Sequence, residues 1–185
     1  MRNMARFTWL LVGFGLISTW GSSQAPSASS TAKISIFISE IQPGALSTAQ
    51  YCTLVYTDHH FHSEKAIRHH GQDTERKVYQ GELSEAEWNS LTSIIDNKDF
   101  RELSPPQTVP PLVMQDTHPF TISVLRDNKY QNLEFLDSKS LKPYQSQIKP
   151  LLQWWKTLRS QRTPESNAPA NKTCALDSTH AVIGQ

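Results

Sequence analysis

The stretch Gly81-Glu82-Leu83-Ser84-Glu85-Ala86-Glu87-Trp88 marks the change from extended chain to helix that decides the fold. Ser84 and Glu87 have the spacing of a capping box, in which each side chain accepts a hydrogen bond from the backbone N–H of the other residue. Leu83 and Trp88 flank this box at the positions of a hydrophobic staple. We therefore predict a helix that begins at Ser84.

The predicted helix carries an apolar stripe, and the polar run 96–99 ends it. The stripe consists of Trp88, Leu91, Ile94 and Ile95. Side chains three and four positions apart share one face of a helix, so this face is expected to pack against a sheet. The stripe is therefore predicted to be core rather than a ligand-binding surface.

Four extended segments precede this helix. In the first, isoleucines at every second position from 34 to 38 give the period of a strand with one buried face, and Pro43-Gly44 then ends the strand. A tight turn is expected at Asp58-His59. The other predicted strands of this group are residues 51–57, 61–68 and 76–82.

A connector, a hairpin and a second helix follow. Residues 104–115 contain four prolines and are expected to be extended, because proline fits neither the interior of a helix nor that of a sheet. The alternating segments 120–124 and 133–135 predict a hairpin around Asp127-Asn128. The last helix has Pro143 in its first turn and an apolar stripe from Tyr144 to Leu158. Because this stripe keeps its phase across Pro150, we predict a kink rather than two helices.

This order of elements predicts an α+β protein. Hairpins rather than strand-helix alternation indicate a mainly antiparallel sheet of five to six strands, with the two helices packed on one face. The opposite face can be exposed to solvent. It bears Ser35, Ser39, Thr121 and Ser123. The folded unit is expected to be one domain, residues 33–161.

The N-terminal residues 1–25 are organised like a secretory signal peptide. Arg2 and Arg6 precede the apolar run 7–17, and small and polar residues follow up to Ala25. The alternative is a membrane anchor, but the apolar run is shorter than the roughly 20 residues that span a bilayer. We therefore expect cleavage, with Ala25 as the favoured position, and an exported protein, either secreted or periplasmic.

The flanks and the cysteines fit export. Residues 26–32 form a Ser/Ala-rich spacer, and the segment 162–185 is expected to be a disordered tail. Cys52 and Cys174 are the two cysteines of the chain, and an oxidising compartment favours a disulfide between them over two free thiols. Charge is balanced, with 18 Lys and Arg against 17 Asp and Glu, which argues against a nucleic-acid partner.

The arrangement resembles small exported bacterial domains of unknown function. The likeness spans residues 33–161 and rests on the leader, the strand pair, Gly81-Glu82-Leu83-Ser84, the Asp127-Asn128 hairpin and the closing helix that contains Trp154-Trp155. In such domains the Asp58-His59 turn would more usually be Asp-Gly. The resemblance implies export and an α+β fold, and it implies no reaction.

Five of the seven histidines fall between residues 59 and 70. His60 and His62 alternate on a predicted strand, about 7 Å apart at their backbones, and could bind one zinc or copper ion. Glu64 shares their face but lies about 13 Å from His60. The alternative, favoured by the lack of a known ligand spacing, is that these are solvent-facing hairpin residues.

The second candidate surface is aromatic. Trp155 lies on the apolar stripe of the last helix and is expected to be core, whereas Trp154 beside it is expected to be partly exposed, next to Lys156 and Arg159. Aromatic and cationic residues are enriched at recognition surfaces. Trp154, together with the proline connector, is a candidate site for an unknown envelope protein or peptide.

Recognisable catalytic motifs are absent from the sequence. It has no Gly-x-Ser-x-Gly elbow, no His-Glu-x-x-His helix and no glycine-rich phosphate loop. We therefore expect a non-enzymatic binding module that is not stably inserted in a membrane after cleavage. The alternatives are a periplasmic metal-binding protein that uses His60 and His62, and a hydrolase without a recognisable motif.

Overall fold

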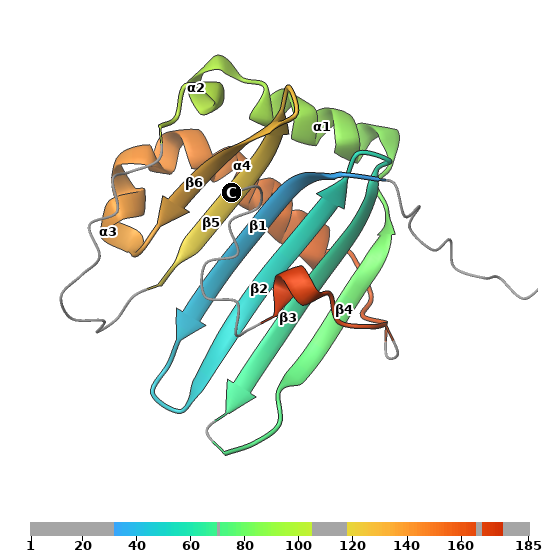
Figure 1. Ribbon diagram of the computed structural model, residues 1–185, viewed down its shortest axis with the longest axis vertical. Helices are drawn as coiled ribbons and strands as arrows, with labels where there is room; N and C mark the ends of the chain where they lie inside the picture. Colours follow the sequence, from blue (N-terminus) through green and yellow to red (C-terminus); the bar gives the residue numbers. More distant parts are fainter. Residues whose placement is uncertain (1–31, 70, 105–117, 166–167, 176–185) are drawn as a thin grey trace, which may run out of the picture.

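The computed structural model describes residues 32–69, 71–104, 118–165 and 168–175. Six antiparallel strands form one sheet in the order β4-β3-β2-β1-β5-β6 (Figure 1). The strands are β1 (Ile34–Pro43), β2 (Ser47–Tyr56), β3 (His60–His69), β4 (Glu75–Glu82), β5 (Phe120–Arg126) and β6 (Lys129–Phe135). The helices are α1 (Glu85–Ile95), α2 (Lys98–Arg101), α3 (Ser138–Leu141) and α4 (Gln145–Ser160), with 3-10 turns η1 (Lys142–Tyr144) and η2 (Lys172–Cys174). The predicted α+β class is confirmed.

The sheet has two parts, a four-stranded meander and a two-stranded hairpin, and they meet where β5 pairs with β1. The first unit, β1 to β4, is a meander in which each strand pairs with the next. The second unit is the β5–β6 hairpin, and β5 pairs with β1 so that Ile38 lies opposite Ile122. Asp127 and Asn128 both adopt positive φ in the tight turn of this hairpin, a conformation that Asp and Asn tolerate better than most residues.

Helix α1 begins as the sequence predicts. The Ser84 hydroxyl accepts a hydrogen bond from the Glu87 N–H, and the Glu87 carboxylate accepts one from the Ser84 N–H at 2.8 Å. The helix ends at Ile95. The polar run after it then forms the unexpected one-turn helix α2, because the Asn97 side chain caps it and Phe100 is buried.

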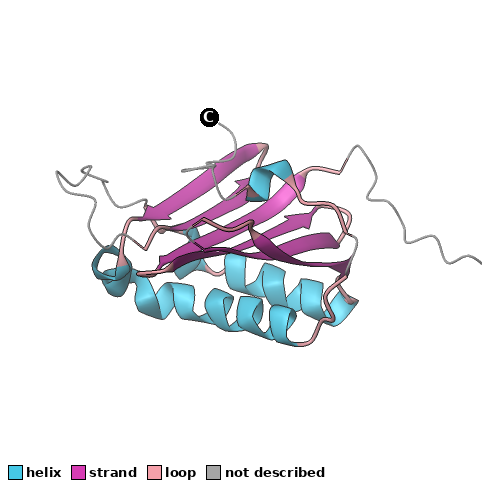
Figure 2. Ribbon diagram, turned by 90° about the horizontal axis from the view of Figure 1, so that it is seen from below, coloured by secondary structure: helices cyan, strands magenta, loops and turns pink. Residues whose placement is uncertain are grey.

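Helices α1 and α4 cover one face of the sheet (Figure 2). Between them and the sheet lies the main core, which includes Leu91, Leu151 and Trp155, all at most 1% exposed. Helix α4 continues through Pro150 as one element, in agreement with the prediction of a single helix. It begins at Gln145, so Pro143 does not lie in its first turn as predicted but in the preceding 3-10 turn.

The opposite face is less open than the serines on it suggested. Ser39 is 9% exposed and Ser123 is fully buried, so the expectation of a solvent-facing surface is wrong for both. A second, smaller core lies on this face, made by Phe37, Cys52, Leu54 and Cys174. The C-terminal segment that contains η2 crosses this side of the sheet, opposite the helices (Figure 2).

The prediction of a disordered tail is wrong for residues 162–165 and 168–175, which have defined positions against the sheet. The Glu165 N–H donates to the Val78 carbonyl at 2.8 Å, and the chain then reaches Cys174 on the sheet. The predicted leader 1–25, the spacer up to residue 31 and residues 105–117 of the proline connector lie outside the described residues. Among the described helices, none is both long enough and apolar enough to cross a membrane.

Candidate functional site

The predicted disulfide is present and fixes the C-terminal segment to the sheet. Cys52 lies in the middle of β2, and its Cα atom is 5.6 Å from that of Cys174. Both cysteines are 1% exposed, and they pack against Phe37 and Leu54. Because the bridge closes a loop with a sequence separation of 122 residues, the chain-entropy model gives it a stabilising effect of about 4–5 kcal/mol.

The histidines predicted to bind metal each meet a carboxylate instead of each other. His60 and His62 lie on the same face of β3, as the alternation predicts. The His62 Nε2 atom is 2.6 Å from Glu64 Oε1, and the His60 Nδ1 atom is 3.4 Å from Asp58 Oδ2. Among the residues described, no three His, Cys, Asp or Glu side chains come together to hold an ion.

Glu64 is the centre of a buried polar cluster under the C-terminal segment. Its carboxylate is 1% exposed and accepts hydrogen bonds from Arg76 and from the Asn171 backbone N–H, in addition to its contact with His62. Burial alone would raise the pKa of Glu64, but hydrogen bonds from His62 and Asn171 and the charge of Arg76 bring it below its usual value. Glu64 is therefore held as a carboxylate within this cluster.

The interpretation of the hairpin histidines as solvent-facing is wrong for His62, which is 6% exposed. The cause is the segment around Asn171, which the disulfide brings over β2 and β3. The Asn171 side chain also donates to the Tyr56 hydroxyl at 3.3 Å. No local pattern around residue 62 indicates this cover, because the covering residues lie more than 100 positions further along the chain.

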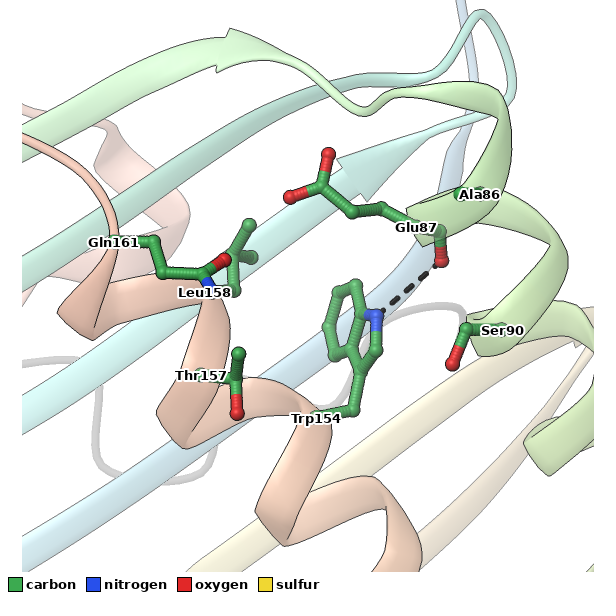
Figure 3. Close-up of a pocket in the computed structure, with 7 residues that line it drawn as sticks. All are labelled: Ala86, Glu87, Ser90, Trp154, Thr157, Leu158 and Gln161. Carbon is green, nitrogen blue, oxygen red and sulfur yellow. Dashed lines mark hydrogen bonds between the residues drawn. The ribbon is translucent and has the colours of Figure 1, made fainter.

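The Trp154 groove is a shallow pocket between α1 and α4 with a volume of about 230 Å³ (Figure 3). We define it by the residues that line it, which are Ala86, Glu87, Ser90, Trp154, Thr157, Leu158 and Gln161. Its walls are mostly apolar, and the hydroxyl and amide groups lie at its edges (Figure 3). The groove lies on the outer side of the helical layer, away from the sheet.

The two adjacent tryptophans lie as predicted, one in the core and one at the surface. Trp155 is 1% exposed, and its Nε1–H donates to the Thr53 hydroxyl at 2.7 Å. Trp154 is half-buried, and its Nε1–H donates to the Glu87 carbonyl at 3.3 Å (Figure 3). This bond fixes the indole across the gap between α1 and α4, so that one side of the ring forms the wall of the groove.

Glu87 keeps its charge although it lies beside the groove. Partial burial would raise the pKa of this carboxyl, but hydrogen bonds from Ser84 and the Arg162 guanidinium at 2.7 Å lower it below its usual value. The carboxylate is therefore neutralised within the protein. It adds little net charge to the Trp154 groove, which is left as an apolar surface with a polar edge.

Arg159 is a neighbour of the two tryptophans in the sequence, and in the structure it contacts two aromatic rings. Its guanidinium lies 4.5 Å from the centroid of the Tyr51 ring and 4.1 Å from that of Trp155. The spacing of Trp155 and Arg159, four residues apart on one helix, is the local signal for this contact. The participation of Tyr51 depends on how the helix lies on the sheet, and no sequence pattern gives it.

The chain was also compared with known proteins. No protein-family model matches it, and the search of curated proteins finds no match.

Proposed function

We propose that this chain is an exported, non-enzymatic binding module that uses the Trp154 groove to bind a peptide segment of an envelope protein. The observation that carries the proposal is the half-buried indole of Trp154, which the Glu87 carbonyl holds beside a mostly apolar depression. A fixed aromatic ring beside an apolar depression is the usual form of an energetically dominant contact at protein interfaces.

The size of the groove favours a side chain of a peptide over a cofactor. Its volume of about 230 Å³ is below the range of roughly 300–1,000 Å³ that is typical of small-molecule sites. One or two apolar side chains would fill it and contact Trp154 and Leu158. Ser90, Thr157 and Gln161 at the edges offer hydrogen bonds to the backbone of the bound segment.

Export is supported by two features of different kinds. The first is the leader-like organisation of residues 1–25. The second is the disulfide between Cys52 and Cys174, since disulfides form and persist in oxidising compartments and are rare in the cytosol. An exported partner, such as another envelope protein, is the class of ligand that such a module would meet.

The test is a selection of peptides from a displayed library against the purified, disulfide-bonded chain. We expect selected peptides to share an apolar anchor, and Trp154→Ala to weaken their binding by at least about tenfold in fluorescence polarisation. Gln153→Ala is the matched control, because Gln153 is an exposed neighbour outside the groove. Equal affinity of the two variants, or no selected peptide, would contradict the proposal.

A metal-binding function is the second candidate, and one observation favours it. Both ring nitrogens of His60 are buried without a hydrogen-bond partner among the described residues, and Asp58 lies beside them. His62 would have to exchange its contact with Glu64 for the ion. Calorimetry with zinc or copper would then show binding that is lost in a His60→Ala/His62→Ala double variant, whereas heat unchanged by the substitutions would exclude this site.

The hydrolase alternative stays a prediction with its own test. Turnover of a substrate in a broad hydrolase panel, abolished by substitution of one histidine, would favour it over a binding module.

A further inference from the structure

A group of positive charges lies on the helix-bearing side of the sheet, next to the C-terminal end of α4. The strand register places Glu40, Tyr51, Lys65 and Lys77 in one row across β1 to β4, all on the same face. Arg159 approaches this row from α4 and contacts the Tyr51 ring. We call Tyr51, Lys65, Lys77 and Arg159 the cationic row.

The cations of this row are close to one another. The Lys65 ammonium lies 5.5 Å from the centroid of the Tyr51 ring and the Arg159 guanidinium lies 4.5 Å from it, so the two charges are within about 10 Å of each other. Lys77 lies directly opposite Lys65 in the register of β3 and β4. Like charges directly opposite each other destabilise a sheet, so this arrangement has a cost in stability.

The charges of the cationic row are not neutralised within the described part of the chain. None of the three cations lies within ion-pairing distance of a carboxylate there. Glu40 is close enough to favour the charged form of Arg159, but its carboxylate accepts a hydrogen bond from Gln42 instead. Burial has the larger effect and lowers the pKa of Arg159.

Arg159 contacts two aromatic rings but, within the residues that the structure describes, lacks hydrogen-bond partners for two of its nitrogens. Its Nε and Nη1 atoms are buried and have no hydrogen-bond partner among the residues described. The flanking rings of Tyr51 and Trp155 stabilise the cation, but a partly desolvated charge gains more from an anionic partner than a fully hydrated one does. By comparison, Arg162 on the same side pairs with Glu87.

We propose that the cationic row is a second binding site, and that its ligand is an acidic peptide segment with at least two carboxylates. In an extended peptide, side chains two positions apart lie on the same side at a spacing of about 7 Å. This spacing suits carboxylates that contact Arg159 and Lys65 at the same time. The adjacent edge of β4 already pairs with another segment of this chain, since the Glu165 N–H donates to the Val78 carbonyl.

The site is distinct from the Trp154 groove, and the two proposals fail independently. Trp154 and Arg159 lie on different faces of α4: Trp154 faces α1, whereas Arg159 faces the sheet. Trp154→Ala is therefore expected to leave binding at the cationic row unchanged.

The experiment measures binding of a fluorescently labelled oligoglutamate peptide to the full chain by polarisation at low and at physiological salt. We expect saturable binding that weakens with salt, and a loss of at least about tenfold in Lys65→Gln/Lys77→Gln. The matched control is Lys98→Gln/Lys129→Gln, which removes the same charge from exposed positions elsewhere and is expected to change affinity by less than about twofold.

A further variant tests the guanidinium itself. Arg159→Lys keeps the charge but loses the planar contact with the rings, and we expect it to weaken binding while thermal unfolding shows a folded protein. Three outcomes would overturn the proposal. These are no saturable binding, an equal loss in the control variant, and preference for a sulfated polysaccharide over the peptide at equal charge.

Discussion

At the scale of single residues, Glu64 shows how a buried charge can be satisfied by partners within the protein. Its carboxylate is surrounded by His62, Arg76 and the backbone of Asn171, and these contacts come from three separate segments of the chain. Removal of one member of a buried ion pair leaves the other without a partner, which is costly. Glu64 therefore connects β3, β4 and the C-terminal segment.

We predict that Glu64→Gln lowers the free energy of unfolding by about 2–4 kcal/mol at neutral pH. The folded-state pKa of Glu64 lies below its usual value, so its contribution is present above the unfolded-state pKa. The contribution is lost as the pH falls through the folded-state pKa. Urea unfolding of wild type and variant at neutral and acidic pH measures the difference.

The control for this prediction is Glu75→Gln, since the Glu75 side chain is 71% exposed. We expect it to change stability by less than about 0.5 kcal/mol at either pH. A stability difference between wild type and Glu64→Gln that stays constant down to acidic pH would show that the ionised carboxylate is not what stabilises the fold.

At the scale of elements, the capping box sets the start of α1 and thereby the position of the Trp154 groove. Glu87 takes part in the box, and its carbonyl also accepts the hydrogen bond from Trp154. The first turn of α1 therefore holds both the helix start and one wall of the groove. A change in the cap is expected to affect helix stability and groove geometry together.

We predict that Ser84→Ala destabilises the protein by about 1 kcal/mol, because the Glu87 N–H loses its acceptor. Ser93→Ala is the matched control within the same helix, where Ala is the better helix former, and we expect it to be neutral or slightly stabilising. Chemical denaturation compares the two variants. Equal stabilities would mean that the box contributes nothing to the start of the helix.

Most elements of the fold could be predicted because their signals are local. The capping box, the alternation of isoleucines in β1 and the Asp127-Asn128 turn each act within a few residues. Helix α2 was missed because its only signals are the cap by Asn97 and one buried ring, Phe100. A single helical turn is too short to show the helical period of apolar residues in the sequence.

The candidate sites were predicted less completely, for a different physical reason. Trp154 could be named because its neighbour Trp155 occupies the apolar stripe. The burial of His62 and the cationic row both depend on contacts between distant segments, which are Asn171 with Glu64 and Arg159 with Tyr51. Such contacts follow from the packing of the whole chain and have no local pattern.

At the scale of the whole molecule, the disulfide joins the C-terminal segment to a sheet that already has helices on its other face. The result is a three-layer arrangement of helices, sheet and a short covering segment (Figure 2). The covering segment buries the smaller core around Phe37 and the polar cluster around Glu64. We therefore expect the cover on the second face of the sheet to depend on the oxidised cysteine pair.

We predict that Cys52→Ala/Cys174→Ala lowers the free energy of unfolding by about 2–5 kcal/mol. It should also speed hydrogen exchange at the Asn171 amide, which donates to Glu64 in the wild type. Wild type treated with a reductant is the internal control and should behave like the variant. Unchanged protection of this amide would show that the segment stays on the sheet without the disulfide.

The central claim is that this chain leaves the cytosol and acts as a disulfide-bonded binding module. The most direct test is mass spectrometry, without reduction, of the chain expressed from residue 1, with residues 1–25 included, in a host that exports proteins. We predict a mature protein that starts after Ala25. After digestion without reduction, the peptide that contains Cys52 should be linked by a disulfide to the one that contains Cys174. A chain that retains residues 1–25 and carries two thiols open to alkylation would contradict the claim.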